Sequence, residues 1–217
     1  MIKGFEPKIS LGQNFLTDER LLRQLVEQTP LTSEDTVLEI GAGQGEFTLA
    51  LAERCKNVIT IETDGRLEKV LRERLSSAPG VRLVMDDVMK LDLDELMRGY
   101  GAFHVAANLP YYLTTPILNL LLHSVMPIRS ISVMVQKEAA QRVMALPGTP
   151  AYGPLAVAAA YRSTPRAALS VPASAFSPPP KVDSVFLVMP CLDRPAVSVK
   201  DERTFRQVVA AAFAMRR

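Results

Sequence analysis

The sequence contains no tryptophan, only two cysteines and only two histidines among its 217 residues. Cys55 and Cys191 have neither the spacing of a metal site nor the pattern of a disulfide framework. His104 and His123 are equally isolated in the chain. We therefore predict no metal centre, and we expect two incidental thiols in a reducing compartment.

Long apolar runs are also missing. No stretch approaches the length of a membrane span, and residues 1–16 lack the pattern of a secretory signal. Hydrophobic residues make up 48% of the chain and charged residues 22%, which is typical of a soluble globular protein. The length suits one large domain, or one domain and a fragment of another. We expect a cytoplasmic monomer that has no contact with a membrane.

The charges are unevenly divided along the chain. Residues 1–136 hold 14 Lys+Arg and 18 Asp+Glu, a net charge of −4, whereas residues 137–217 hold 11 and 5, a net charge of +6. An acidic first part and a basic last part fit a small-molecule site joined to a surface for a polyanion. Arginines that only solvate helices would give the same totals, so charge alone leaves both interpretations open.

Strand and helix patterns alternate five times. Short apolar runs predict strands over 36–40, 58–61, 81–85, 103–107 and 131–135. Helical patterns follow them over 46–53, 66–76, 93–97, 116–123 and 138–146. Alternation of this kind predicts βαβ units and a parallel sheet, and right-handed crossovers then give a doubly wound, Rossmann-like α/β fold.

The last third of the chain continues differently. A helix is predicted over 151–161, and strands over 167–171 and 184–188 flank a proline-rich loop at 177–181. Residues 190–196 have the composition of a linker, and an amphipathic helix begins near Lys200. We expect two units, 1–195 and 196–217, the second being the linker and first helix of an incomplete carboxyl-terminal helical domain.

Three features at the predicted strand ends suggest a nucleoside-bearing cofactor. Gly41-Ala42-Gly43-Gln44-Gly45 joins the first strand to a helix, Glu62 closes the second strand, and Asp87 follows the third. A glycine turn lets the backbone approach a ligand, and an acid at the second strand can accept both hydroxyls of a ribose. A dinucleotide is disfavoured because Glu46 would repel a pyrophosphate. S-adenosylmethionine has a ribose and an adenine but no phosphate, so we favour it.

Asn108-Leu109-Pro110-Tyr111 closes the fourth strand. An amide side chain and a turn carbonyl can accept hydrogen bonds from an amino group, and an aromatic ring can stack on a flat base. Ligands of open α/β sheets bind at this edge. The tetrapeptide therefore suggests chemistry on a planar, amino-bearing substrate, although Asn and Pro are also ordinary turn residues.

Together these motifs resemble those of the ribosomal RNA adenine N6-dimethyltransferases, in the same order along the chain. The matching segments are Leu11 to Leu16, Glu39 to Gly45, Glu62 to Asp64, Asp87 to Met89, Asn108 to Tyr111, Val135 to Glu138 and Val171 to Ser184. The leucine of Asn-Leu-Pro-Tyr and the triple proline before Lys181 resemble the small-subunit enzymes more than the resistance enzymes that act on large-subunit RNA.

The resemblance implies a class I S-adenosylmethionine-dependent methyltransferase with S-adenosylhomocysteine as product. It assigns the cofactor to six residues and the adenine to five, with Phe176 as a second stacking wall. The cofactor residues are Asn14, Leu16, Gly41, Glu62, Asp87 and Asn108, and the catalytic residues are Asn108, Leu109, Pro110, Tyr111 and Phe176.

The resemblance also implies a substrate. This is a pair of adjacent adenosines in a small-subunit (16S) rRNA hairpin, methylated on an immature small ribosomal subunit. Lys137, Arg142, Arg162, Arg166 and Arg216-Arg217 are the candidate contacts to RNA phosphates. Three alternatives stay open: a large-subunit enzyme conferring antibiotic resistance, a DNA-adenine or protein-glutamine methyltransferase, and a non-catalytic RNA-binding factor on the same fold.

Overall fold

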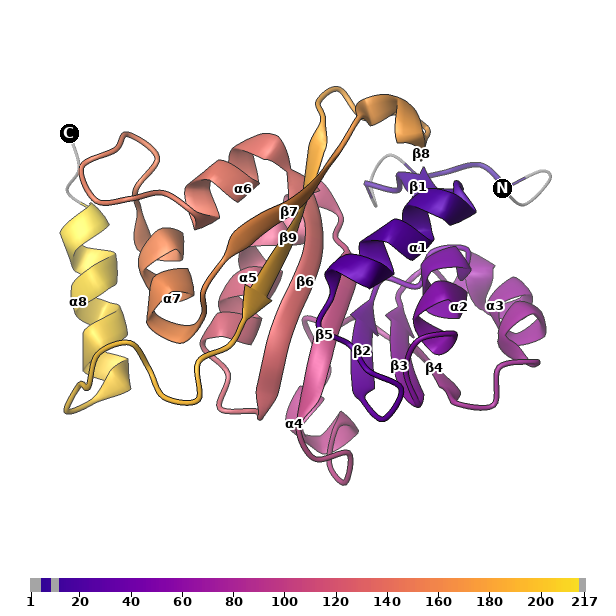
Figure 1. The fold of residues 1–217 in the computed structure, drawn as a ribbon, viewed down its shortest axis with the longest axis horizontal. Coiled ribbons are helices and arrows are strands. Elements are labelled where there is room, and N and C mark those ends of the chain that lie inside the picture. The colour runs from indigo at the N-terminus through magenta and orange to yellow at the C-terminus, as the bar shows by residue number, and fades with distance from the viewer. Residues whose placement is uncertain (1–4, 9–11, 215–217) are drawn as a thin grey trace.

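The computed structural model describes residues 5–8 and 12–214. Its centre is a seven-stranded sheet in the order β4-β3-β2-β5-β6-β9-β7 (Figure 1). The strands are β2 Thr36–Ile40, β3 Asn57–Glu62, β4 Val81–Met85, β5 Phe103–Asn108, β6 Ile128–Gln136, β7 Arg166–Val171 and β9 Ser184–Pro190. The five predicted strands pair in parallel, which confirms the Rossmann-like interpretation. β9 differs, because it runs antiparallel to both β6 and β7.

Helices cover both faces of this sheet, as expected for a doubly wound fold. They are α1 Glu19–Gln28, α2 Glu46–Ala52, α3 Glu68–Leu75, α4 Leu93–Leu96, α5 Thr114–Leu122, α6 Lys137–Val143, α7 Pro154–Arg162 and α8 Glu202–Ala214. Short 3₁₀ turns are η2 Gly65–Leu67, η3 Tyr111–Leu113 and η4 Ala173–Ala175.

Strand alternation divides the core into two layers. Val37 of β2 points to the layer of α1 and α2, and its neighbour Leu38 points to the layer of α4 to α7. Ala106 and Ala107 of β5 divide in the same way. Since successive side chains of a strand face opposite sides, both faces of the parallel strands are buried and read as apolar runs.

A second, two-stranded sheet was not predicted from the sequence. β1 (Phe15–Leu16) pairs antiparallel with β8 (Phe176–Ser177), which joins the start of the chain to the proline-rich region (Figure 1). Strands of two residues have no alternation pattern to detect. The pairing holds Asn14 beside the carboxyl end of β5, where the Asn108 amide donates to the Asn14 carbonyl at 3.0 Å.

The helix α8 packs on α7 through aromatic side chains. The rings of Tyr161 and Phe205 have centroids 4.8 Å apart, and the Tyr161 hydroxyl donates to Glu202 Oε1 at 3.3 Å. Phe213 makes a similar contact with Tyr152, at 5.7 Å. Of the apolar face predicted for this helix, Val208 remains 61% exposed. No helix within 5–8 and 12–214 is long and apolar enough to cross a membrane.

Candidate active site

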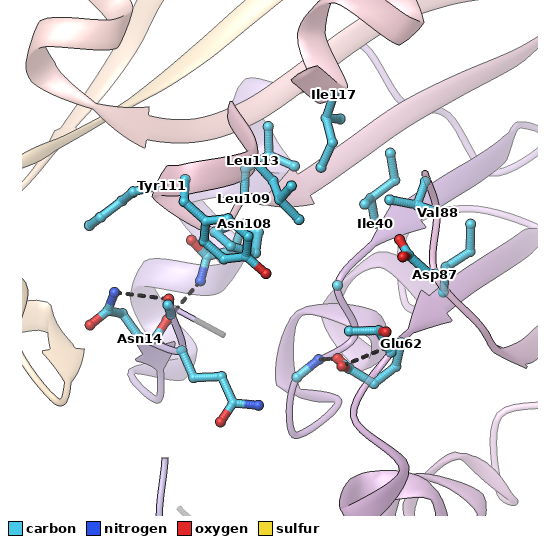
Figure 2. Close-up of a pocket in the computed structure, with 18 of the residues that line it drawn as sticks. Asn14, Ile40, Glu62, Asp87, Val88, Asn108, Leu109, Tyr111, Leu113 and Ile117 are labelled. Atoms are coloured by element: carbon cyan, nitrogen blue, oxygen red, sulfur yellow. Dashed lines mark hydrogen bonds between the residues drawn. The ribbon is translucent and has the colours of Figure 1, made fainter. Parts of the chain in front are cut away.

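The carboxyl ends of four adjacent strands, β4, β3, β2 and β5, border one open cavity. Of the residues predicted for the site, it is lined by Asn14, Gly41, Glu62, Asp87, Asn108, Leu109, Pro110 and Tyr111 (Figure 2). The cavity has two parts. We call Glu62, Asp86 and Asp87, after β3 and β4, the acidic half, and Asn108, Tyr111 and Tyr112, after β5, the aromatic half.

Backbone amides hold the carboxylate of the acidic half. Glu62 Oε2 accepts from the Gly43 amide at 2.8 Å, and Oε1 accepts from Thr63 and Asp64 at 2.9 and 2.8 Å (Figure 2). Burial raises the pKa of Glu62, and these three hydrogen bonds act against the rise. Oε1 already accepts two of these bonds and Oε2 one, so Oε2 keeps a lone pair with which the carboxylate can accept from a ligand hydroxyl.

The glycine turn is shaped by Gly43, which has a φ of +56° and lies 3.2 Å from the Phe15 ring at the position a Cβ would take. A larger residue would be strained there and would press on Phe15, which lines the cavity. Behind the turn, the Thr48 hydroxyl donates to Glu39 Oε2 at 2.6 Å and ties α2 to β2. Burial raises the pKa of Glu39 to about 7.

Apolar side chains close the cavity between its two halves. They are Ile40 at the end of β2, Val88 in the turn after β4, Leu113 in η3 and Ile117 in α5 (Figure 2). They could not be predicted as site residues, because an apolar residue at a strand end or on a helix looks the same in the sequence whether it lines a cavity or packs in the core. They give this part of the cavity apolar walls that suit a flat, apolar-faced ring, and Asp87 lines the same cavity.

Asn108 is oriented by its neighbours in the aromatic half. Its Nδ2 donates to the backbone carbonyl of Asn14 at 3.0 Å, so Oδ1 is left as the acceptor of this side chain (Figure 2). A flipped amide would place an oxygen against a carbonyl oxygen, so the hydrogen bond fixes the assignment.

The turn after Asn108 leaves one carbonyl available. The Pro110 carbonyl accepts from the Leu113 amide at 3.0 Å, whereas no donor to the Leu109 carbonyl is found within 5–8 and 12–214. The Tyr111 hydroxyl hydrogen-bonds with Ser184 Oγ at 2.9 Å. Burial raises the Tyr111 pKa, with the bond to Ser184 acting against the rise, so the phenol keeps its proton. Ser184 closes the late motif of the sequence, and its contact with Tyr111 was not predicted.

Two predicted residues stand away from the cavity walls. Phe176 is 4% exposed and packs in the core beneath β1, because the β1–β8 pairing sets it opposite Leu16. Phe176 does not line the cavity in this structure, and its role as a second stacking wall stays a prediction. Leu16 is also a core residue, 6% exposed, and it borders only a small adjoining hollow beside Gly41 and Asn108.

The predicted basic surface does not form one patch. Lys137 opens α6 directly after β6 and is exposed on the cavity side, with Arg142 in the last turn of that helix. Arg162 and Arg166 instead bond the carbonyls of Ser124 and Gln28 at 3.1 and 2.9 Å, at the opposite edge of the sheet. Leu11, Arg216 and Arg217 lie outside the described residues.

Comparisons with known proteins place this geometry in a family. Residues 4–217 match the family described as ribosomal RNA adenine dimethylase. The ribosomal RNA small subunit methyltransferase A of Shouchella clausii is 46% identical over 99% of this chain and 74% of its own length. The protein of the same name from Moorella thermoacetica is 44% identical over 99% and 77%. The chain thus spans about three quarters of the length of these relatives.

Solved structures agree with the sequence relatives. The 23S rRNA methyltransferase ErmE superposes with a TM-score of 0.79 at 27% identity, covering 93% of this chain and 79% of that one. A dimethyladenosine transferase from Plasmodium falciparum gives 0.75 at 26% identity, covering 94% and 72%. With a family match along nearly the whole chain and relatives above 40% identity, this chain belongs to the ribosomal RNA adenine dimethylase family.

Proposed function

We propose that this chain is an rRNA adenine N6-dimethyltransferase that uses S-adenosylmethionine to methylate two adjacent adenosines of small-subunit (16S) rRNA during ribosome biogenesis. The observation that carries this proposal is the orientation of Asn108. Its Nδ2 is held by the Asn14 carbonyl, and its Oδ1 is therefore available to accept a hydrogen bond from an amino group. The Leu109 carbonyl, one residue later, supplies a second acceptor.

These two acceptors suit the chemical difficulty of the reaction. The lone pair of adenine N6 is delocalised into the ring, which makes N6 a weak nucleophile. Two hydrogen bonds donated by N6 to Asn108 Oδ1 and the Leu109 carbonyl favour a tetrahedral nitrogen and return the lone pair to it. Alignment of N6 with the methyl carbon supplies much of the remaining rate. The N6–C bond would form as the methyl carbon's bond to the sulfonium sulfur breaks, and the N6 cation would then release a proton to solvent, so no strong base is needed.

The acidic half fits a phosphate-free nucleoside cofactor. When bound, S-adenosylmethionine supplies an electrophilic methyl group and leaves as S-adenosylhomocysteine. Glu62 would accept from a ribose hydroxyl, Asp87 from the adenine amine, and Ile40 and Val88 would enclose the ring. Glu46, at the start of α2, forms an ion pair with Arg74 at 2.7 Å, and this carboxylate is a poor neighbour for a pyrophosphate. Asn14, Leu16 and Gly41 are the proposed contacts of the methionine end; Asn14 and Gly41 line the cavity, and Leu16 borders the hollow beside it.

The aromatic half fits an extruded base. Tyr111 is half-buried, and its hydroxyl is anchored to Ser184, so its ring presents a fixed surface in the cavity. Base–aromatic stacking contributes about 1–3 kcal/mol per base, which helps to hold a nucleotide outside its helix. Lys137 and Lys181, both exposed, are the candidate phosphate contacts on this side. We infer that a monomer acts on immature small subunits in the cytoplasm.

The relatives favour the small subunit over the large. Proteins named for small-subunit methylation share 46 and 44% of their residues with this chain, and the 23S enzyme ErmE shares 27%. A large-subunit resistance enzyme and a non-catalytic RNA-binding factor are the remaining alternatives. Retention of Asn108, Tyr111, Glu62 and Asp87 in one cavity supports catalysis over binding alone.

The test is transfer of labelled methyl groups to immature small ribosomal subunits, with large subunits and DNA as competitors. We expect label on small-subunit RNA, recovered after digestion as N6,N6-dimethyladenosine. Label on large-subunit RNA would support the resistance enzyme instead. Label only on DNA, or none on any substrate although the cofactor binds, would contradict the proposal.

A further inference from the structure

A second tyrosine of the aromatic half, Tyr112, has a position that the proposed reaction does not use. It follows Tyr111 in η3 and lines the same cavity, yet it is 54% exposed. An exposed aromatic side chain is not unusual in itself. This one combines exposure with a place at the open side of the proposed active site.

The backbone of Gly12 makes room for the Tyr112 ring. A Cβ at Gly12 would lie 3.3 and 3.5 Å from Cδ1 and Cε1 of the ring, and 3.6 Å from Pro110 Cβ. Gly12 has a φ of +59°, which L side chains rarely adopt. One edge of the ring, with Cδ1 and Cε1, therefore lies beside the Gly12 backbone, while the residue as a whole is 54% exposed.

The two tyrosines differ in how they are held. The Tyr111 hydroxyl is bonded to Ser184, which is fully buried. The Tyr112 hydroxyl has no hydrogen-bond partner in the parts of the chain that the structure describes. Anchoring suits a wall against which a base is positioned for reaction. An exposed ring at the open side of the cavity suits contact with a group that arrives from solvent.

We propose that Tyr112 stacks on the nucleotide next to the target adenosine and is thus a further RNA-binding residue. This rests on the proposed function, because a target base held beside Tyr111 leaves its neighbour in the strand near the open side of the cavity. When the target base is extruded, the neighbouring base loses its stacking partner. Stacking on an aromatic ring replaces that contact and does not depend on which base it is. Tyr112 would act on RNA affinity and leave the methyl-transfer step unchanged.

Two substitutions of Tyr112 distinguish base stacking from packing of its side chain against Gly12. Tyr112→Leu keeps an apolar side chain over Gly12 but removes the aromatic face, and Tyr112→Phe keeps the face but removes the hydroxyl. Val125→Ala is the matched surface control, because Val125 is 82% exposed and lies between α5 and β6, at the opposite edge of the sheet.

The measurements are the KM for immature small subunits, kcat at saturating subunits, and the cofactor Kd by calorimetry. For Tyr112→Leu we expect KM to rise roughly tenfold, the size of one lost base–aromatic stack, with kcat and the cofactor Kd unchanged. Tyr112→Phe and Val125→Ala should match the wild type. An unchanged KM in Tyr112→Leu, or a cofactor Kd that rises as much as KM, would overturn the proposal.

The activity of the wild-type chain distinguishes a failure of the Tyr112 proposal from a failure of the proposed function. If the wild-type chain methylates small subunits and Tyr112→Leu does so with the same KM, only the role of Tyr112 is wrong. If the wild-type chain binds the cofactor and methylates no RNA, the proposed function fails and the role of Tyr112 falls with it.

Discussion

The two halves of the cavity are held in place by different kinds of bond. In the acidic half, three backbone amides fix Glu62, and they belong to the glycine turn and to the end of β3 itself. In the aromatic half, Asn108 and Tyr111 are fixed by residues far away in the sequence, at separations of 94 and 73. The first arrangement is local to the βαβ unit, and the second requires the whole domain to be folded.

This difference explains why the acidic half could be predicted from the sequence and the aromatic half only in part. The glycine turn and Glu62 are placed by consecutive elements of a βαβ unit, so spacing along the chain predicts their meeting. Ser184 and Asn14 reach the aromatic half through β9 and the β1–β8 pairing. No local pattern predicts either contact, and the core position of Phe176 depends on the same β1–β8 pairing.

The fold shows the same limit. The five parallel strands and their helices alternate with a regular period and were predicted within a few residues. The antiparallel insertion of β9 between β6 and β7 was not, because a buried apolar strand reads the same in either direction. The apolar walls formed by Ile40 and Val88 were missed because cavity walls and core share residue types.

Asn108→Ala should give the largest effect. The variant loses the acceptor proposed for N6, so we expect kcat to fall about 10²–10³-fold, the usual cost of one hydrogen-bonding group that acts on the reacting atoms. Single-turnover methylation of small subunits measures this. Asn119→Ala is the control for loss of an amide, because Asn119 is a half-buried residue of α5. The same fall in kcat in this control would indicate a general loss of structure.

Glu62→Gln tests the acidic half alone. The amide keeps one acceptor oxygen, but its NH₂ group would face a backbone amide that now donates to a carboxylate. Since hydrogen bonds to charged groups contribute about 1.5–3 kcal/mol, the cofactor Kd should rise roughly 10- to 150-fold. The rate at saturating cofactor should stay near that of the wild type. A fall in that rate with Kd unchanged would refute the assignment.

The pH dependence of cofactor binding gives a second test of Glu62. The ionised carboxylate is the stronger acceptor for a ligand hydroxyl, and burial raises the pKa of Glu62 above the ordinary value of 4.5. Cofactor affinity should therefore be full at neutral pH and decline as the pH falls, with a midpoint above 4.5. Calorimetry across this range measures it, and Glu62→Gln should lack the transition. A midpoint at or below 4.5 would contradict the burial effect.

Tyr111→Phe and Ser184→Ala should give a smaller effect on the aromatic half. Each removes the same hydrogen bond, which typically contributes about 0.5–1.5 kcal/mol, so kcat/KM for small subunits should fall roughly 2- to 12-fold. Because both changes break one interaction, the double variant should be no worse than either single one. Additive losses would mean that the two groups act independently.

Glu39→Gln should have the smallest effect on activity, and its effect should appear in stability. Glu39 is fully buried behind the glycine turn, with a pKa raised to about 7 against 4.5 for an ordinary glutamate. The folded state thus holds a proton between these pH values that the unfolded state releases, so this residue costs stability as the pH rises through that range. The melting temperature of Glu39→Gln minus that of the wild type should increase from pH 5 to pH 8. An unchanged difference would contradict this.

The most direct test of the division is to measure the cofactor Kd and the single-turnover rate at saturating cofactor for Asn108→Ala and Glu62→Gln side by side. We expect a crossed pattern, in which Asn108→Ala loses rate and keeps the cofactor Kd within a few-fold, and Glu62→Gln loses affinity and keeps the rate. If both variants lose both quantities in proportion, the cavity acts as a single unit and the proposed division is wrong.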